Sequence, residues 1–130
     1  MRQSRRHLPV ALIWSSLVAL CLFGRSVAAA DAVDAERATQ RIHLEISGRV
    51  QGVGFRDFTQ RAARQLSIAG WVRNIPNGRV ELVAEGKEAA IQKFQEQIKK
   101  GPLGARVDGV KTLTVDDAEK FKDFDIKESL

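Results

Sequence analysis

Cysteine, tyrosine and histidine are nearly absent from this 130-residue chain, which contains one cysteine, no tyrosine and two histidines. The cysteine, Cys21, lies in an apolar leading segment, so a chain without that segment has no disulfide framework and no cysteine-based metal site. His43 is the one histidine beyond that segment, and it has no second histidine or cysteine with which to share a metal. We therefore expect no metal site, and we interpret His43 as a solvated or rim residue on the polar face of a strand rather than a catalytic one.

An excess of positive charge is also absent from most of the chain. The 21 Lys and Arg exceed the 16 Asp and Glu by five, but four arginines lie among the first thirty residues, where there is no acidic residue. From Asp31 onward 17 basic residues therefore face all 16 acidic ones, a net charge of +1. RNA-binding sheets combine basic surface with exposed aromatic side chains, and Trp71 is the one tryptophan of this part. We expect no nucleic-acid partner.

The first thirty residues have the order of a secretory signal peptide. Arginines precede a mostly apolar stretch from Leu8 to Phe23, and small residues follow up to Ala30. We expect cleavage near residues 28–30 and export to the periplasm or the exterior. Arg25 lies between the apolar stretch and the cleavage site, so an uncleaved membrane anchor is the alternative. The apolar stretch is short for an anchor, because spanning a bilayer takes about 20 residues.

The domain itself is predicted to start at Arg41. Residues 31–40 are polar and alanine-rich without an apolar stripe, which indicates a linker. In the following segment 41–47, Ile42, Leu44 and Ile46 alternate with polar residues. This period of two predicts a strand with one buried face. The domain is expected to cover residues 41–130.

Two amphipathic helices and a hairpin are predicted beyond this strand. A helix of about twelve residues is indicated from residue 55, and a second one from 87 to 100 ends at Gly101-Pro102. The apolar residues at helical spacing are Phe55, Phe58 or Thr59, Ala62 and Leu66 in the first helix, and Ala90, Ile91, Phe94 and Ile98 in the second.

Between the two helices, Pro76-Asn77-Gly78 separates strands 71–75 and 79–85, and Asn-Gly is a strong hairpin signal. Alternating segments at 107–115 and 124–127 supply further strands. The order β-α-β-β-α-β with a short extra strand is typical of an α+β, ferredoxin-like sandwich, an antiparallel sheet with both helices on one face.

A glycine-rich turn from Gly48 to Arg56 joins the first strand to the first helix. Glycines tolerate positive φ, a helix start carries partial positive charge, and arginine offers a planar fork of donors. We interpret the turn as a phosphate cradle; a tight strand-to-helix connection is the plain alternative. It is not a nucleotide P-loop, because Gly54-Phe55-Arg56 replaces Gly-Lys-Ser/Thr. It is not a dinucleotide fingerprint either, because Asp57 stands in place of the third glycine.

This turn, together with Asn74 inside the segment 70–74, resembles the acylphosphatase family. The patterns Gly-x-Val-Gln-Gly-Val-x-Phe-Arg and Gly-Trp-Val-x-Asn are matched at every fixed position, and the resemblance extends from about Arg41 to the end of the chain. Two departures occur. Ser67 stands where glycine is frequent, and Asp57 stands where an aromatic residue often follows the arginine.

The resemblance implies hydrolysis of the carboxyl–phosphate anhydride of an acyl phosphate, without metal or cofactor. It implies that Arg56 holds the phosphoryl group and that Asn74 positions the attacking water. Backbone amides of the loop are implied as further phosphate donors: Arg49, Val50, Gln51, Gly52, Val53, Gly54 and Phe55. The implied partners are a small acyl phosphate and inorganic phosphate as product. We expect a monomer that touches a membrane only through an uncleaved N-terminal segment.

The position of Asn74 along its strand supports a place beside the glycine loop, and one alternative remains for this residue. Asn74 has the same parity as Val72, so if Val72 faces the helices, Asn74 lies on that side as well. Alternatively, Asn74 is a strand-end residue that bonds its own turn. We interpret Arg73, Arg79 and Arg49 as solvated charges, although Arg49 could add positive field at the mouth of the site.

Two other functions are compatible with the fold. One is a non-enzymatic ferredoxin-like module that binds an anion, a partner or RNA. The other is the N-terminal module of a larger maturation enzyme, which the end of the chain soon after the last strand makes the less favoured interpretation.

Overall fold

The computed structural model describes residues 38–130. The predicted signal peptide, its cleavage or anchoring, Cys21 and most of the linker lie outside these residues. Within them no helix is long and apolar enough to cross a membrane. The elements in chain order are β1 (Thr39–Arg49), α2 (Phe55–Gln65), β2 (Ala69–Ile75), the 3-10 turn η1 (Pro76–Gly78), β3 (Arg79–Lys87), α3 (Glu88–Lys100), β4 (Arg106–Thr112) and β5 (Phe124–Ile126).

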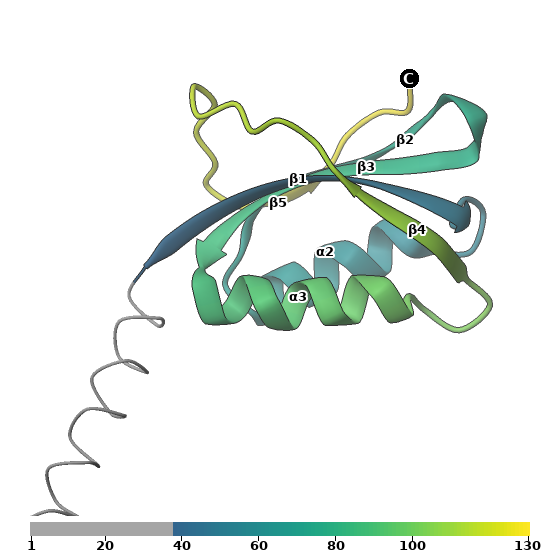
Figure 1. Cartoon of the computed structure of the whole chain (residues 1–130), viewed down its shortest axis with the longest axis horizontal. Coiled ribbons are helices and arrows are strands. Elements are labelled where there is room, and N and C mark those ends of the chain that lie inside the picture. The colour runs from purple at the N-terminus through teal and green to yellow at the C-terminus, as the bar shows by residue number, and fades with distance from the viewer. Residues whose placement is uncertain (1–37) are drawn as a thin grey trace, which may run out of the picture. The chain divides into compact units, whose positions relative to one another are not determined.

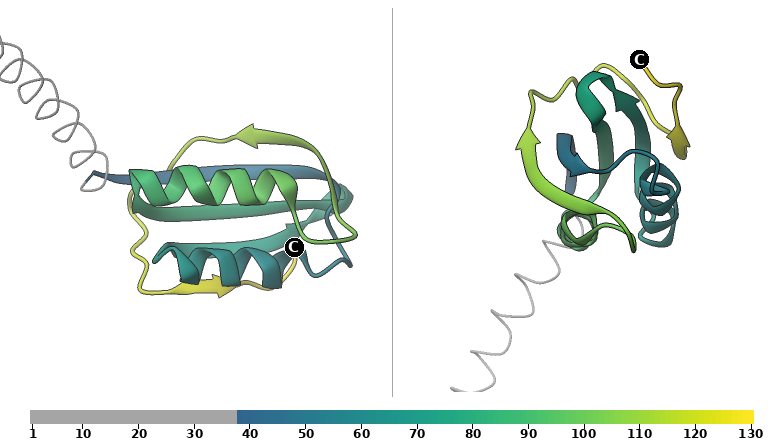
Figure 2. Two further views of the ribbon diagram at one scale, coloured as in Figure 1. Left: turned by 90° about the horizontal axis from the view of Figure 1, so that it is seen from below. Right: turned by 90° about the vertical axis from the view of Figure 1, so that its right-hand side faces the viewer.

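The sheet has five strands in the spatial order β4-β1-β3-β2-β5, and both helices cover one face of it (Figures 1 and 2). The ferredoxin-like α+β fold is confirmed, with two differences. First, β1 starts at Thr39, so residues 39–40 belong to the strand and not to a linker. Second, β5 pairs in parallel with β2, so the sheet is mixed and not wholly antiparallel. The reason is that the chain crosses from β4 at one edge to the opposite edge before it forms β5.

The core lies between the sheet and the two helices. Ile42, Leu44 and Ile46 of β1 are at most 5% exposed, as their alternation predicts. Phe94 of α3 and Phe124 of β5 are fully buried and meet edge to face, with ring centroids 6.0 Å apart. Burying side chains of this size contributes about 1.5–3 kcal/mol each, so this layer fixes the helices on the sheet.

Residues with a left-handed backbone conformation lie just beyond α2 and in the turn of the β2–β3 hairpin. Asn77 and Gly78 have φ of 67° and 76°, which confirms the predicted Asn-Gly turn. Ser67 has φ of 56° just beyond α2. A residue with a Cβ is strained there by about 1 kcal/mol, which explains why glycine suits this position. The departure at Ser67 thus leaves the helix end in place.

The face of the sheet away from the helices carries cross-strand ion pairs. Arg41 pairs with Glu85 and Arg79 with Glu45. Arg73 donates to Glu81 at 2.8 Å, and its guanidinium lies 4.8 Å from the Trp71 ring centroid. Arg73 and Arg79 are therefore paired side chains of the sheet, and the expectation that they are simply solvated is wrong.

Residues 113–123 cross this face on their way from β4 to β5 and cover part of it (Figure 1). The His43 side chain is consequently only 21% exposed, which fits the rim position of the prediction and not the solvated one. Its Nδ1 lies 2.9 Å from the Thr114 carbonyl oxygen, and its Nε2 lies 2.7 Å from Glu81. Trp71 is also covered, at 7% exposure, which removes it as an open platform for a base.

Glu81 makes the stability of this face depend on pH. Burial raises the pKa of its carboxyl, but hydrogen bonds from His43 and Arg73 outweigh burial, so the pKa lies below its ordinary value of 4.5. A pKa that is lower in the folded state stabilises the protein above the ordinary value, and this stabilisation is lost as the pH falls through the folded pKa. We expect the free energy of unfolding to decrease below about pH 4.5, and Glu81→Gln to weaken that decrease.

Urea unfolding midpoints at pH 7 and pH 3 measure this effect. The matched control is Asp117→Asn, which removes an exposed carboxyl of the crossing segment 113–123. A Glu81→Gln protein that loses as much stability between the two pH values as the parent would remove Glu81 from this explanation.

Candidate active site

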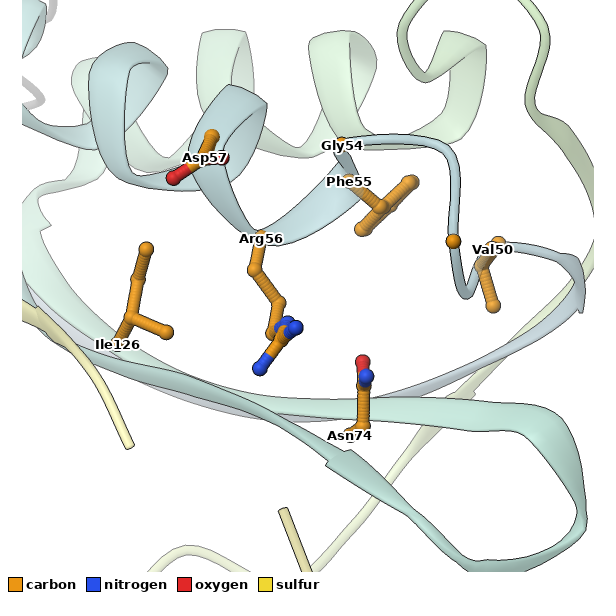
Figure 3. A pocket seen from close by; sticks show the side chains of 8 residues that line it. Val50, Gly54, Phe55, Arg56, Asp57, Asn74 and Ile126 are labelled. Carbon is orange, nitrogen blue, oxygen red and sulfur yellow. The ribbon is translucent and has the colours of Figure 1, made fainter. Parts of the chain in front are cut away.

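A pocket of about 310 Å³ opens where the glycine loop meets the start of α2 (Figure 3). Strands β1 and β2 run in the same direction on either side of β3. The loop that leaves β1 and the C-terminal end of β2 therefore lie at the same end of the sheet. The register shows this directly, because Ile46 and Asn74 both pair with Val80. The lining residues are Val50, Gly52, Gly54, Phe55, Arg56, Asp57, Asn74 and Ile126.

The loop reaches this position through two left-handed glycines. Gly52 and Gly54 have φ of 73° and 75°, a conformation that costs glycine nothing and other residues about 1 kcal/mol. Gly54 precedes α2 without a side-chain cap, and Phe58 N–H donates to the Gly54 carbonyl at 3.0 Å. The amides of residues 55–57 precede this bond and have no helical acceptor. They supply partial positive charge to the pocket that these three residues line.

The predicted backbone donors divide into two groups in the structure. Val50, Gly52, Gly54 and Phe55 line the pocket. The other three do not: Arg49 is exposed, and Gln51 and Val53 are partly buried.

Arg56 lies on the first turn of α2, and its side chain extends toward Asn74 (Figure 3). It is partly buried. Within residues 38–130 its guanidinium has no carboxylate partner, unlike that of Arg73 or Arg79. A guanidinium that lines a pocket and is not neutralised by the protein is suited to bind an anion through two parallel hydrogen bonds.

Asn74 lies on β2 and faces the pocket, as does the start of α2 (Figure 3). Val72 is fully buried toward the helices, so the parity prediction is confirmed. The Oδ1 atom of Asn74 is buried and has no hydrogen-bond partner among the described residues. Leaving such an acceptor unpaired costs about 1–3 kcal/mol. The alternative in which Asn74 bonds its own turn does not fit this geometry.

Three residues extend the site beyond the sequence prediction of Arg56 and Asn74. Asp57, which departs from the family pattern, is exposed at the rim of the pocket. Ile126 lines the pocket from β5, and no sequence signal placed this strand beside β2. The side chain of Gln51 bonds the carbonyls of Ile75 and Arg79, which the sequence could not indicate because backbone carbonyls have no residue signature.

Together, the fold and the site define a class: small ferredoxin-like α+β proteins with a pocket at the glycine loop between the first strand and the first helix. The model of the acylphosphatase family matches residues 42–126. Acylphosphatase from Rubrobacter xylanophilus is 46% identical over 80 residues, which are 62% of this chain and 73% of that protein. Acylphosphatase from Salinibacter ruber is 46% identical over 88 residues, 68% of this chain and 93% of that protein.

A solved structure agrees with these sequence matches. The crystal structure of acylphosphatase from Bacillus subtilis aligns with a TM-score of 0.64 at 39% identity, covering 69% of this chain and 99% of that one. The chain belongs to the acylphosphatase family. Its activity is that of a hydrolase acting on acid anhydrides, the acyl phosphates, and the alternative of a non-enzymatic binding module does not hold.

Proposed function

We propose that Arg56 and the loop amides hold the phosphoryl group of the acyl phosphate while Asn74 positions the water that attacks phosphorus. One observation carries this division of roles. Arg56, which has no carboxylate partner within residues 38–130, and the Asn74 oxygen, which has no hydrogen-bond donor there, line the same pocket (Figure 3). The first is complementary to an anion, and the second is complementary to a water proton.

Arg56 would bind two phosphoryl oxygens with its planar fork. Each charge-assisted hydrogen bond contributes about 1.5–3 kcal/mol. Val50, Gly52, Gly54 and Phe55 line the same pocket, and their backbone amides would add donors near the start of α2. Because these groups belong to the folded loop and helix, they would stabilise the phosphoryl oxygens as the charge on them changes in the transition state.

Asn74 would act by orientation, because a carboxamide does not take up a proton near neutral pH. Its Oδ1 accepts a hydrogen bond from the water and directs the water oxygen toward phosphorus. The bond from the water oxygen to phosphorus forms as the bond from phosphorus to the acyl oxygen breaks. The carboxylate leaves with that electron pair, and a phosphoryl oxygen of the substrate takes the water proton. The products are a carboxylate and inorganic phosphate.

Hydrolysis of benzoyl phosphate in water labelled with ¹⁸O tests which atom the water attacks. The same reaction with and without a metal chelator tests whether catalysis needs a metal. Attack at phosphorus puts the label into inorganic phosphate and leaves benzoate unlabelled. Label in benzoate would show attack at the carbonyl carbon, where Asn74 could not have the proposed role. Loss of turnover with the chelator would contradict metal-free catalysis.

We also propose that the protein acts outside the cytoplasm after removal of residues 1–30. The support is the order of the leading segment, in which a basic start, an apolar stretch and small residues follow one another. N-terminal sequencing of the protein from fractionated cells tests the proposal. We expect a chain that begins near residues 29–31 in the exported fraction. An intact N-terminus in the membrane fraction would establish an anchor instead.

A further inference from the structure

Gln51 belongs to the glycine loop, but its side chain bonds the β2–β3 hairpin instead of lining the pocket. Its Nε2 donates to the Ile75 carbonyl at 3.0 Å and to the Arg79 carbonyl at 2.8 Å. A primary amide nitrogen has two hydrogens, so both are used. The residue is partly buried, and the two acceptors lie 24 and 28 positions along the chain.

The two acceptors are at the mouth of the hairpin. Ile75 is the last residue of β2, Arg79 is the first of β3, and the two are paired across the ladder. Ile75 also directly follows Asn74. Between loop residues 50–54 and hairpin residues 75–79, no other hydrogen bond is found in the part of the chain that the structure describes. Within the described residues, the side chain of Gln51 therefore makes the hydrogen bonds that connect the glycine loop to the end of β2, next to Asn74.

We propose that Gln51 is a positioning residue that sets the distance between the bound phosphoryl group and the water on Asn74. The proposal rests on the roles assigned to Arg56 and Asn74 above. Reaction requires the water oxygen about 3–3.5 Å from phosphorus and in line with the leaving group, and a displacement of 1 Å can cost about 100-fold in rate. The register of β1, β3 and β2 brings the loop and the hairpin to the same end of the sheet, and the two Gln51 bonds join the loop itself to the hairpin. Gln51 fixes the spacing between them while its own side chain stays outside the pocket.

A merely structural role predicts something different. If Gln51 only stabilised the hairpin, its loss would lower the unfolding midpoint and leave the kinetics of the folded fraction unchanged. A positioning role predicts a lower kcat with nearly unchanged phosphate affinity. The inhibition constant of inorganic phosphate reports the loop and Arg56 alone, so it separates binding from the placement of water.

Gln51→Met tests the proposal, because methionine keeps the length of the side chain and removes both donors. We expect kcat for benzoyl phosphate to fall about tenfold or more, and the inhibition constant of phosphate to stay within about twofold. The matched control is Gln60→Met, since Gln60 Nε2 of α2 donates to the Phe124 carbonyl at 2.9 Å, away from the hairpin. This control should keep kcat within about twofold of the parent. An unchanged kcat in Gln51→Met, or an equal loss of kcat and of phosphate affinity, would overturn the proposal.

Measuring kcat for Gln51→Met in an Asn74→Ala background tests whether Gln51 acts through Asn74. Without the Asn74 side chain there is no bound water for Gln51 to help place. Gln51→Met should therefore change the residual kcat of the Asn74→Ala protein by less than about twofold. If Asn74→Ala lowers kcat and Gln51→Met lowers it by the same factor in both backgrounds, the Gln51 proposal fails and the role of Asn74 stands. If Asn74→Ala turns over at the parent rate, the role of Asn74 fails, and the proposed link through it fails as well.

Discussion

Arg56→Ala should lower kcat/KM for benzoyl phosphate about 10³-fold and weaken inhibition by phosphate. The substitution removes a fork of donors that has no carboxylate partner within residues 38–130, so little else in the fold depends on it. It also leaves the pocket without its arginine, while the amides at the start of α2 remain. Steady-state hydrolysis and phosphate inhibition measure the two effects on one sample.

Two further variants serve as controls: one tests the planar geometry of the Arg56 side chain separately from its charge, and the other tests whether losing any arginine of α2 has the same effect. Arg56→Lys keeps the positive charge but loses the planar fork, so we expect a partial loss of about 10–100-fold. Arg61→Ala removes an exposed arginine of the same helix and should act like the parent. Parental kinetics in Arg56→Ala, or an equal loss in Arg61→Ala, would contradict the assignment of Arg56 to the phosphoryl group.

Asn74→Ala should lower kcat about 10²–10³-fold while phosphate inhibition stays within about threefold of the parent. Loss of the amide removes the group proposed to orient water and leaves the Arg56 guanidinium and the loop residues in place. The variant should fold normally, because its buried Oδ1 makes no hydrogen bond to the described residues. Deleting an unpaired buried acceptor does not reduce stability and can slightly increase it. Turnover, phosphate inhibition and the urea midpoint together check these three statements.

Asn74→Asp is the isosteric companion of this variant. It keeps an acceptor oxygen for the water but adds a negative charge to the pocket proposed to bind the phosphoryl group. We expect phosphate inhibition to weaken as well, in contrast to Asn74→Ala. Equal phosphate inhibition in the two variants would place residue 74 away from the bound anion.

The parts of the site that the sequence predicts are those encoded by local patterns. The alternation of Ile42, Leu44 and Ile46 fixes which face of β1 is buried, and the glycines then mark where the chain turns into α2. Parity along β2 places Asn74 on the same side as Val72. Residues whose direction is set within a few positions of the chain could therefore be placed correctly.

The parts that the sequence does not predict depend on contacts between distant segments. His43 is covered because residues 113–123 return across the sheet, and its partner Thr114 lies 71 positions away. Ile126 reaches the pocket because β5 pairs in parallel with β2. The bonds of the Gln51 side chain have no sequence signal, because their acceptors are main-chain carbonyls, which every residue carries. No local periodicity contains this information.

Calorimetric titration of inorganic phosphate into the parent, Arg56→Ala and Asn74→Ala proteins tests most directly that binding and water placement are separate tasks. With kcat measured on the same samples, both variants should be slow, but only Arg56→Ala should bind phosphate more weakly than the parent. Loss of phosphate binding in Asn74→Ala to the same degree as in Arg56→Ala, or parental phosphate binding in Arg56→Ala, would contradict the separation of the two roles.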